Sequence, residues 1–150
     1  MELKSLLVDT KTVWVEFPGL DGFEVELANL SRKELVALRK RCTINKFNRK
    51  TRAFEESLDD DKFLKEFTQA TVKGWRGMKL NYLEDLVLVD LGGQDGNKEL
   101  PYSHENALQL VENSSEFDNW LNEVVFDLEI FRTSEQGKNR EKIKTIPRSQ

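Results

Sequence analysis

Two stretches of alternating apolar and polar residues near the N-terminus predict a β-hairpin. In VWVEFPGLDGFEVEL, residues 13–27, apolar side chains recur at every second position on both sides of a Pro-Gly-Leu-Asp-Gly segment. Proline fixes one φ angle and glycine allows positive φ, so this segment has the composition of a turn. Because two strands alone are only marginally stable, we expect the hairpin to lie against helices or to find another strand.

Apolar residues at spacings of three and four predict about four or five helices after the hairpin. The clearest start is LSRKEL, where Ser31 and Glu34 form a capping box, and this helix runs to about Cys42. The fold class is therefore α+β, an N-terminal β-hairpin packed on a mostly helical domain. Further helices are expected over 59–78 with a bend near Gly74 and Gly77, at the start of 80–91 before an extended segment, over 104–112 after Ser103, and from Ser114 or Ser115 to about Arg132.

Charge is concentrated in the middle and at the end of the chain. Residues 39–52 contain seven Lys or Arg and no acid, whereas residues 55–61 contain five acids. Such runs are usually solvated, so we expect a loop between helices; a segment that folds back on itself, or a mobile one, is the alternative. The basic end lacks apolar periodicity, which predicts a single α+β domain over 1–136 and a flexible basic tail over 137–150.

The overall composition is typical of a globular protein with a generous polar surface. Hydrophobic residues make up 38% and charged residues 33% of the chain, and the formal net charge is −4. This negative charge disfavours general nucleic-acid binding. No apolar run approaches the roughly 20 residues of a membrane-spanning helix, and the single cysteine has no partner for an internal disulfide. We therefore expect a cytoplasmic protein that does not contact a membrane.

The segment GGQDGNKELPYSHENALQLV, residues 92–111, raises the question of a catalytic or metal site, because it holds the chain's one histidine and several acids. Its glycines do not fit a dinucleotide or P-loop pattern, and its acids miss the spacing of an EF-hand loop. His104, expected to be exposed at a helix start, has neither a second histidine nor a nucleophile motif near it. Cys42 lies on the apolar side of its helix, as a core thiol would. We predict a loop before a helix, with no catalytic residue, metal or cofactor.

Large apolar side chains are concentrated in the second half of the chain. Aromatic stripes usually pack inward, so the core is the first interpretation of Trp75, Phe117 and Trp120. The last predicted helix nevertheless has an apolar arc wider than a surface helix needs, and aromatic residues commonly anchor protein contacts. The resulting candidate partner-binding residues are Trp75, Phe117, Trp120, Val124, Phe126, Ile130 and Phe131.

Several motifs occur in an order that resembles a known protein family. These are Lys73-Gly74-Trp75-Arg76-Gly77, then Leu100-Pro101-Tyr102-Ser103 followed by Glu105-Asn106-Ala107, then Phe117-Asp118-x-Trp120. Together they resemble the tail assembly chaperones of long-tailed, siphovirus-type bacteriophages, and the likeness spans about residues 10–132. None is a catalytic motif, so the resemblance depends on their order.

The resemblance implies a non-catalytic assembly factor that works in the host bacterial cytoplasm. Such chaperones coat and solubilise the long, helical tape measure protein, help to recruit the tail tube (major tail) protein, and are absent from the mature virion. Members are often made in two lengths by a ribosomal frameshift, so a frameshift-extended form of this chain is a further implied partner. We also expect self-association through the excess aromatic face of the last predicted helix. Many weakly bound copies along one filament gain by multivalency.

Two other functions are compatible with the sequence. One is a structural tail completion or connector protein of the virion. The other is a small nucleic-acid-binding regulator that uses 39–52, where Phe47 and Phe54 accompany the basic side chains. The adjacent acidic block disfavours this last function.

Overall fold

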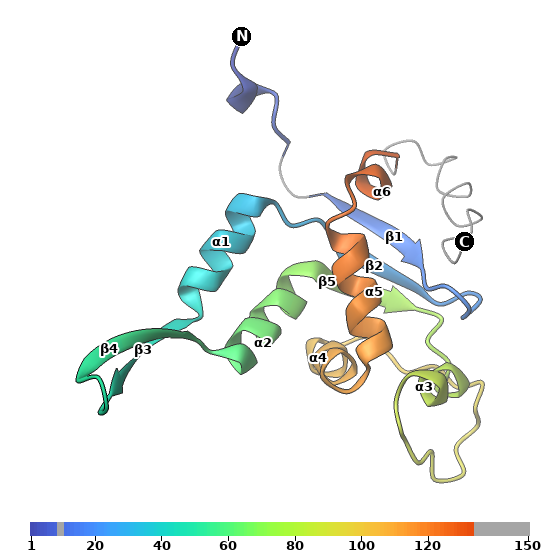
Figure 1. The fold of residues 1–150 in the computed structure, drawn as a ribbon. Coiled ribbons are helices and arrows are strands. Elements are labelled where there is room, and N and C mark those ends of the chain that lie inside the picture. The colour runs from blue at the N-terminus through green and yellow to red at the C-terminus, as the bar shows by residue number, and fades with distance from the viewer. Residues whose placement is uncertain (9–10, 134–150) are drawn as a thin grey trace.

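A three-stranded antiparallel sheet, a separate two-stranded hairpin and six α-helices make up the described part of the chain (Figure 1). The structure is a computed structural model and describes residues 1–8 and 11–133. The α+β class predicted from the sequence is confirmed, whereas the predicted tail, 137–150, lies outside the described residues. In chain order the elements are η1 (Leu3–Ser5), β1 (Thr12–Glu16), β2 (Glu24–Ala28), α1 (Arg32–Arg41), β3 (Thr43–Asn48), β4 (Ala53–Leu58), α2 (Asp60–Thr71), β5 (Val72–Arg76), α3 (Leu80–Leu86), α4 (His104–Asn113), α5 (Ser115–Val125) and α6 (Leu128–Thr133).

The predicted N-terminal hairpin is confirmed as β1 and β2. The two strands are antiparallel, with Val15 opposite Val25. Their alternation places Val15 in the core and leaves Trp14, on the other face, only partly buried. Gly19 and Gly22 have φ angles of 88° and 84°, which an L-residue with a side chain rarely adopts, and they make the turn.

Strand β5 completes the main sheet at a place where the sequence predicted a helix. The helix predicted over 59–78 is correct as α2 only as far as Thr71, after which the chain becomes extended and pairs with β2. Gly74 and Gly77 weaken a helix at this point, and a third strand gives the hairpin the support that two strands lack. A Cβ at Gly77, where φ is 76°, would overlap the carbonyl oxygen of Gly22, so β5 and the hairpin turn approach closely.

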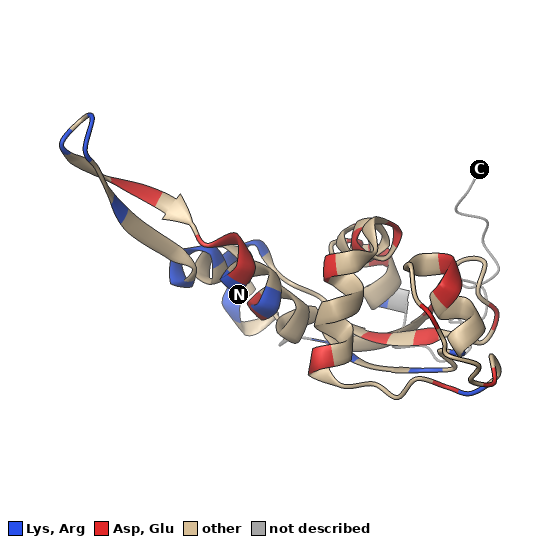
Figure 2. Ribbon diagram, turned by 90° about the horizontal axis from the view of Figure 1, so that it is seen from below, with Lys and Arg blue, Asp and Glu red and all other residues tan. Residues whose placement is uncertain are grey.

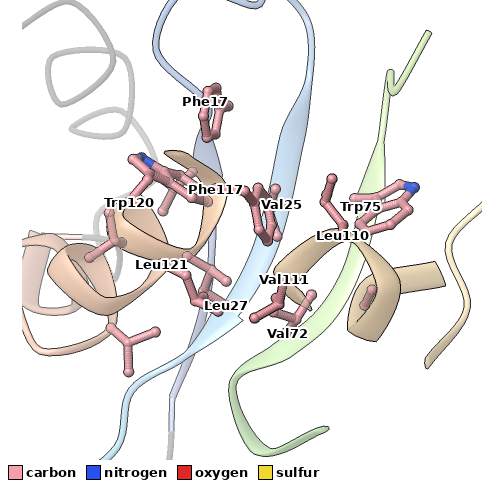
Figure 3. Packing of buried hydrophobic residues seen from close by; sticks show 14 of the residues in the cluster. Phe17, Val25, Leu27, Val72, Trp75, Leu110, Val111, Phe117, Trp120 and Leu121 are labelled. Carbon is pink, nitrogen blue, oxygen red and sulfur yellow. The ribbon is translucent and has the colours of Figure 1, made fainter. Parts of the chain in front are cut away.

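The hydrophobic core lies between one face of this sheet and the helices α4 and α5, which cross it (Figures 1 and 3). Phe17 from the end of β1 stacks on Phe117 of α5 with ring centroids 6.0 Å apart, and Trp120 lies 4.9 Å from the Phe17 ring. On the other side of the core, the Trp75 indole N–H donates to the Leu100 carbonyl at 3.0 Å. Aromatic packing therefore joins the last helices to the first hairpin.

Serine caps begin three helices, as the sequence predicted. The hydroxyl of Ser31 accepts from the backbone N–H of Glu34, and the Glu34 carboxylate accepts from the N–H of Ser31, so the capping box is confirmed. Ser103 and Ser114 likewise accept from the amides three residues further on. The short helix predicted before an extended segment is also confirmed, because α3 ends at Leu86.

The last predicted helix is divided in two, so the described residues contain six α-helices rather than about four or five. α5 ends at Val125, and α6 begins at Leu128. The carboxylate of Asp127 accepts from the N–H of Glu129 at 3.0 Å and starts the new helix. After the break α6 packs on β1, whereas α5 packs on α4. The wide apolar arc of the predicted helix is therefore buried against two different surfaces. Among the described helices, none is both long enough and apolar enough to cross a bilayer.

The loop expected between the first two helices is instead a projecting hairpin of β3 and β4, residues 43–58, which we call the arm (Figures 1 and 2). No residue in either strand is buried. The alternative in which the charged segment folds back on itself is the one observed, since Lys46 lies opposite Glu55 and Phe47 opposite Phe54. Opposite charges and paired rings across two strands stabilise such a ladder.

Candidate functional site

Six of the seven predicted partner-binding side chains are buried. α5 packs on the sheet and on α4, so both sides of its apolar stripe are covered (Figure 3). In this structure these six therefore stabilise the fold and present very little accessible surface. Phe126, the seventh, is 43% exposed, with its ring centroid 6.3 Å from that of Phe67. The buried six, each 7% exposed or less, are Trp75, Phe117, Trp120, Val124, Ile130 and Phe131.

His104 begins α4 and is exposed, as the sequence predicted. Its Nδ1 lies 3.1 Å from the hydroxyl of Tyr102, which donates to the Val72 carbonyl at 2.9 Å. Burial, and then the charge of Glu26, raise the pKa of Tyr102 and keep it a neutral donor. The histidine is thus tied to β5 through Tyr102. Within the described ranges, no three His, Cys, Asp or Glu side chains are grouped as a metal ion would need.

Cys42 is a core thiol, which confirms its sequence interpretation. It is fully buried at the end of α1, and its Sγ lies 3.7 Å from Oε2 of Glu66. Burial first, and then the charge and hydrogen bond of Glu66, raise the pKa of this thiol. Because the thiolate is the reactive form, this environment works against nucleophilic chemistry at neutral pH.

An open groove lies between α4 and the segment that follows α3. Its volume is about 490 Å³, within the range of about 300–1,000 Å³ that is typical of binding sites. Leu88 stands out in it because its side chain is 103% exposed, as in an extended chain. None of the lining side chains is titratable, so the site has the character of a binding surface. The groove is lined by Leu83, Val87, Leu88, Val89, Leu100, Asn106, Gln109, Leu110 and Asn113.

Backbone hydrogen bonds anchor both ends of the segment that carries the apolar wall of the groove. The loop that follows Val89 returns beside α3, where the N–H of Asn81 donates to the Gly96 carbonyl at 2.9 Å. Further along the chain, the N–H of Leu100 donates to the Met78 carbonyl at 2.8 Å. A Cβ at Gly96 would overlap the Asn81 side chain, so a larger residue there would push that side chain aside. These bonds fix Leu100 and the loop beside α3, and the N–H of Val87 donates to the Leu83 carbonyl at 3.0 Å.

The opposite wall is a row of amide side chains on α4. Asn106, Gln109 and Asn113 recur at spacings of three and four, which places them on one side of the helix. Gln109 Nε2 donates to the Glu105 carboxylate at 3.3 Å, and Asn113 Nδ2 donates to the Gln109 backbone carbonyl at 2.8 Å. Amides both donate and accept, so this wall suits the polar side of a visiting segment while the leucines and valines take its apolar side.

The groove lies at an acidic end of the molecule. Residues 80–112 contain seven Asp or Glu and one Lys or Arg. Figure 2 shows several acidic positions among fewer basic ones at the end of the body far from the arm, and basic positions at the tip of the arm. A surface of this kind attracts cationic segments and repels acidic ones. Exposed acids next to groove-lining positions in the sequence, or one helical turn from them, are Glu84, Asp90, Glu105 and Glu112.

Sequence reasoning did not select the groove. Its apolar wall comes from 80–91, where helix and strand periodicities compete, so no face was distinguishable. The signal available was the Val87-Leu88-Val89 run, which is apolar yet bordered by acids and glycines.

Comparisons with protein families, curated proteins and solved structures found nothing that matches this chain.

Proposed function

We propose that the protein is a non-catalytic tail assembly chaperone of a long-tailed bacteriophage that binds the tape measure protein in the groove. The observation that carries this proposal is the apolar wall that faces a row of amides, with no titratable side chain in the lining. A site without an acid, base or nucleophile is suited to binding another chain rather than to chemistry. The ordered motifs that resemble this chaperone family support the same function.

The client is expected to be a helix with an apolar stripe, which is what a tape measure protein offers along its length. Its stripe would lie on Leu88 and the neighbouring valines, and its polar flank on the amides of α4, in the manner of helix-in-groove recognition. Each groove binds weakly, whereas many copies along one client bind with avidity. Weak individual contacts let tube subunits displace the copies one at a time.

The remaining parts of the proposal follow from this role. The chaperone acts in the host bacterial cytoplasm, presents the client to the tail tube protein, and is absent from the mature virion. A frameshift-extended form of the chain would carry the same groove and join the same coat. The acidic surface around the groove keeps the coated complex soluble.

Co-expression with the tape measure protein tests the proposal. Leu88→Asp alters a fully exposed side chain, so we expect the free energy of unfolding to change by less than about 0.5 kcal/mol, while the charge disrupts docking on the apolar wall. Leu7→Asp is the matched control, because Leu7 is 67% exposed and lies outside the groove. We expect soluble client with the wild type and with the control, and insoluble client with Leu88→Asp. Equal solubility in all cases, or without the chaperone, would refute the proposal.

Mass spectrometry of purified particles separates this function from that of a virion component. A chaperone leaves the tail as the tube forms, so we expect no peptide of this chain in particles that retain the tube protein. Stoichiometric recovery of the chain would favour a completion or connector protein instead.

A further inference from the structure

The arm presents two phenylalanine rings to solvent. Phe47 and Phe54 pair across its strands with ring centroids 5.4 Å apart, and they are 53% and 73% exposed. Arg49, Lys50 and Arg52 lie in the turn next to them, where Figure 2 shows the basic tip. The rings therefore lie between this basic turn and the Lys46–Glu55 pair, and exposed rings beside a basic turn are typical of a protein contact surface.

The groove complements the arm in apolar character and in charge. Its apolar wall includes the exposed Leu88 and the partly exposed Val89, which suit aromatic rings. The acids beside it, among them Glu84 and Glu112, are exposed and opposite in sign to the arm turn. Matching of this kind steers association and fixes its orientation.

The arm and the groove meet only between two copies of the chain. The arm leaves the body between α1 and α2 and points away from α3, so arm and groove lie at opposite ends of the molecule (Figures 1 and 2). Its six-residue strands reach about 20 Å at about 3.3 Å per residue. A contact between two different patches of identical chains is heterologous and adds copies head to tail.

We propose that, before a client arrives, the arm of one copy occupies the groove of a second copy. The contact covers the exposed rings of the arm and the exposed leucine of the groove at once, which removes apolar surface from water. A client that needs the same groove then releases the arm. This exchange rests on the proposed function, whereas the self-association does not.

Analytical ultracentrifugation of the full chain, without any client, tests the self-association. We expect the wild type to form species larger than one chain, and their fraction to fall as salt rises from about 0.05 M to about 0.5 M, because exposed charges are screened. An arm variant, Arg49→Glu with Lys50→Glu, and a groove variant, Leu88→Asp, each disable one side of the contact. We expect each to weaken association by about tenfold or more, and Leu7→Asp to associate as the wild type does. Circular dichroism checks that all variants remain folded.

Mixing the two variants gives the sharpest result. The groove variant retains its arm and the arm variant retains its groove, so one intact contact is available. We expect a one-to-one dimer that does not grow, because both remaining ends are disabled.

Three results of the sedimentation experiments would overturn the inference. They are a wild type that stays monomeric at all concentrations, association that neither variant weakens, and a mixture that forms no dimer. Salt-sensitive binding of a labelled oligodeoxythymidylate by monomeric wild type would also overturn it, in favour of a nucleic-acid arm. These measurements contain no tape measure protein, so their failure leaves the co-expression result untouched.

Discussion

Phe117→Ala separates a core residue from a partner-binding residue, because the two roles predict different losses of stability. Phe117 is fully buried, and its ring contacts those of Phe17 and Trp120 at centroid distances of 6.0 and 5.6 Å. Truncating a buried phenylalanine costs about 3–5 kcal/mol through lost transfer energy and the cavity that remains. The two ring contacts, each worth about 0.5–1.5 kcal/mol, place this site in the upper half of that range.

Urea denaturation followed by circular dichroism measures this loss. We expect the free energy of unfolding to fall by about 4–5 kcal/mol, a large part of the total of about 5–15 kcal/mol that domains possess. The melting temperature should fall by roughly 8–20 °C for a chain of this size. Phe126→Ala, at the half-exposed ring of the predicted set, is the control and should lose much less. A loss below about 1 kcal/mol for Phe117→Ala would refute the assignment of this residue to the core.

Three further changes test other parts of the fold. In urea denaturation, Gly77→Ala should lower the free energy of unfolding by about 3 kcal/mol or more, because the new Cβ overlaps backbone atoms and the φ angle is positive. Gly19→Ala has the same kind of φ angle but open space around it, so it should lower the free energy of unfolding by only about 1–2 kcal/mol. Because the pKa of Cys42 is raised above its ordinary value of 9.0, the folded state keeps that proton as the pH rises, so stability should decline above about pH 9 in urea titrations. In Cys42→Ala the stability should decline less steeply with pH. An equally steep decline would contradict the assignment of this pH dependence to the Cys42 thiol. Tyr102→Phe should lose about 1 kcal/mol, the usual contribution of a hydrogen bond, and no loss would mean that the bond to β5 is unimportant.

Local chemistry made part of the fold predictable from the sequence. The first hairpin follows from strict alternation and a Pro-Gly turn, and the helix starts follow from Ser31, Ser103 and Ser114, whose caps act within four residues. These signals are short-range, so tertiary contacts had little opportunity to override them.

Long-range contacts decided the elements that the sequence misplaced. The segment 59–78, whose apolar spacing predicted one helix, forms a helix as far as Thr71 and a strand after it. Pairing with β2 selects the strand. The arm has no buried face, so it lacks the periodicity that marks a strand, and its pairing depends on cross-strand partners such as Lys46 and Glu55. The last helix divides because Asp127 starts a new one, a signal that competes with a continuous apolar stripe.

The candidate site was less predictable than the fold, because the sequence does not show which apolar side chains become buried. Composition identified an excess of large apolar side chains, but it did not say which of them the sheet would cover. The structure buries Trp120 and leaves Leu88 fully exposed, although both are large and apolar. Which apolar residue faces solvent depends on the loop closed by Gly96 and on the placement of α4, and neither has a local sequence signature.

Amide chemical-shift mapping by NMR tests most directly whether this chain binds a helix of its client in the groove. The labelled full-length protein is titrated with a helical fragment of the tape measure protein. The account predicts that shift changes cluster on residues 83–89 and 106–113, the two walls of the groove. Changes confined to another surface, such as the open face of the sheet around Trp14, with the groove amides unmoved, would contradict it.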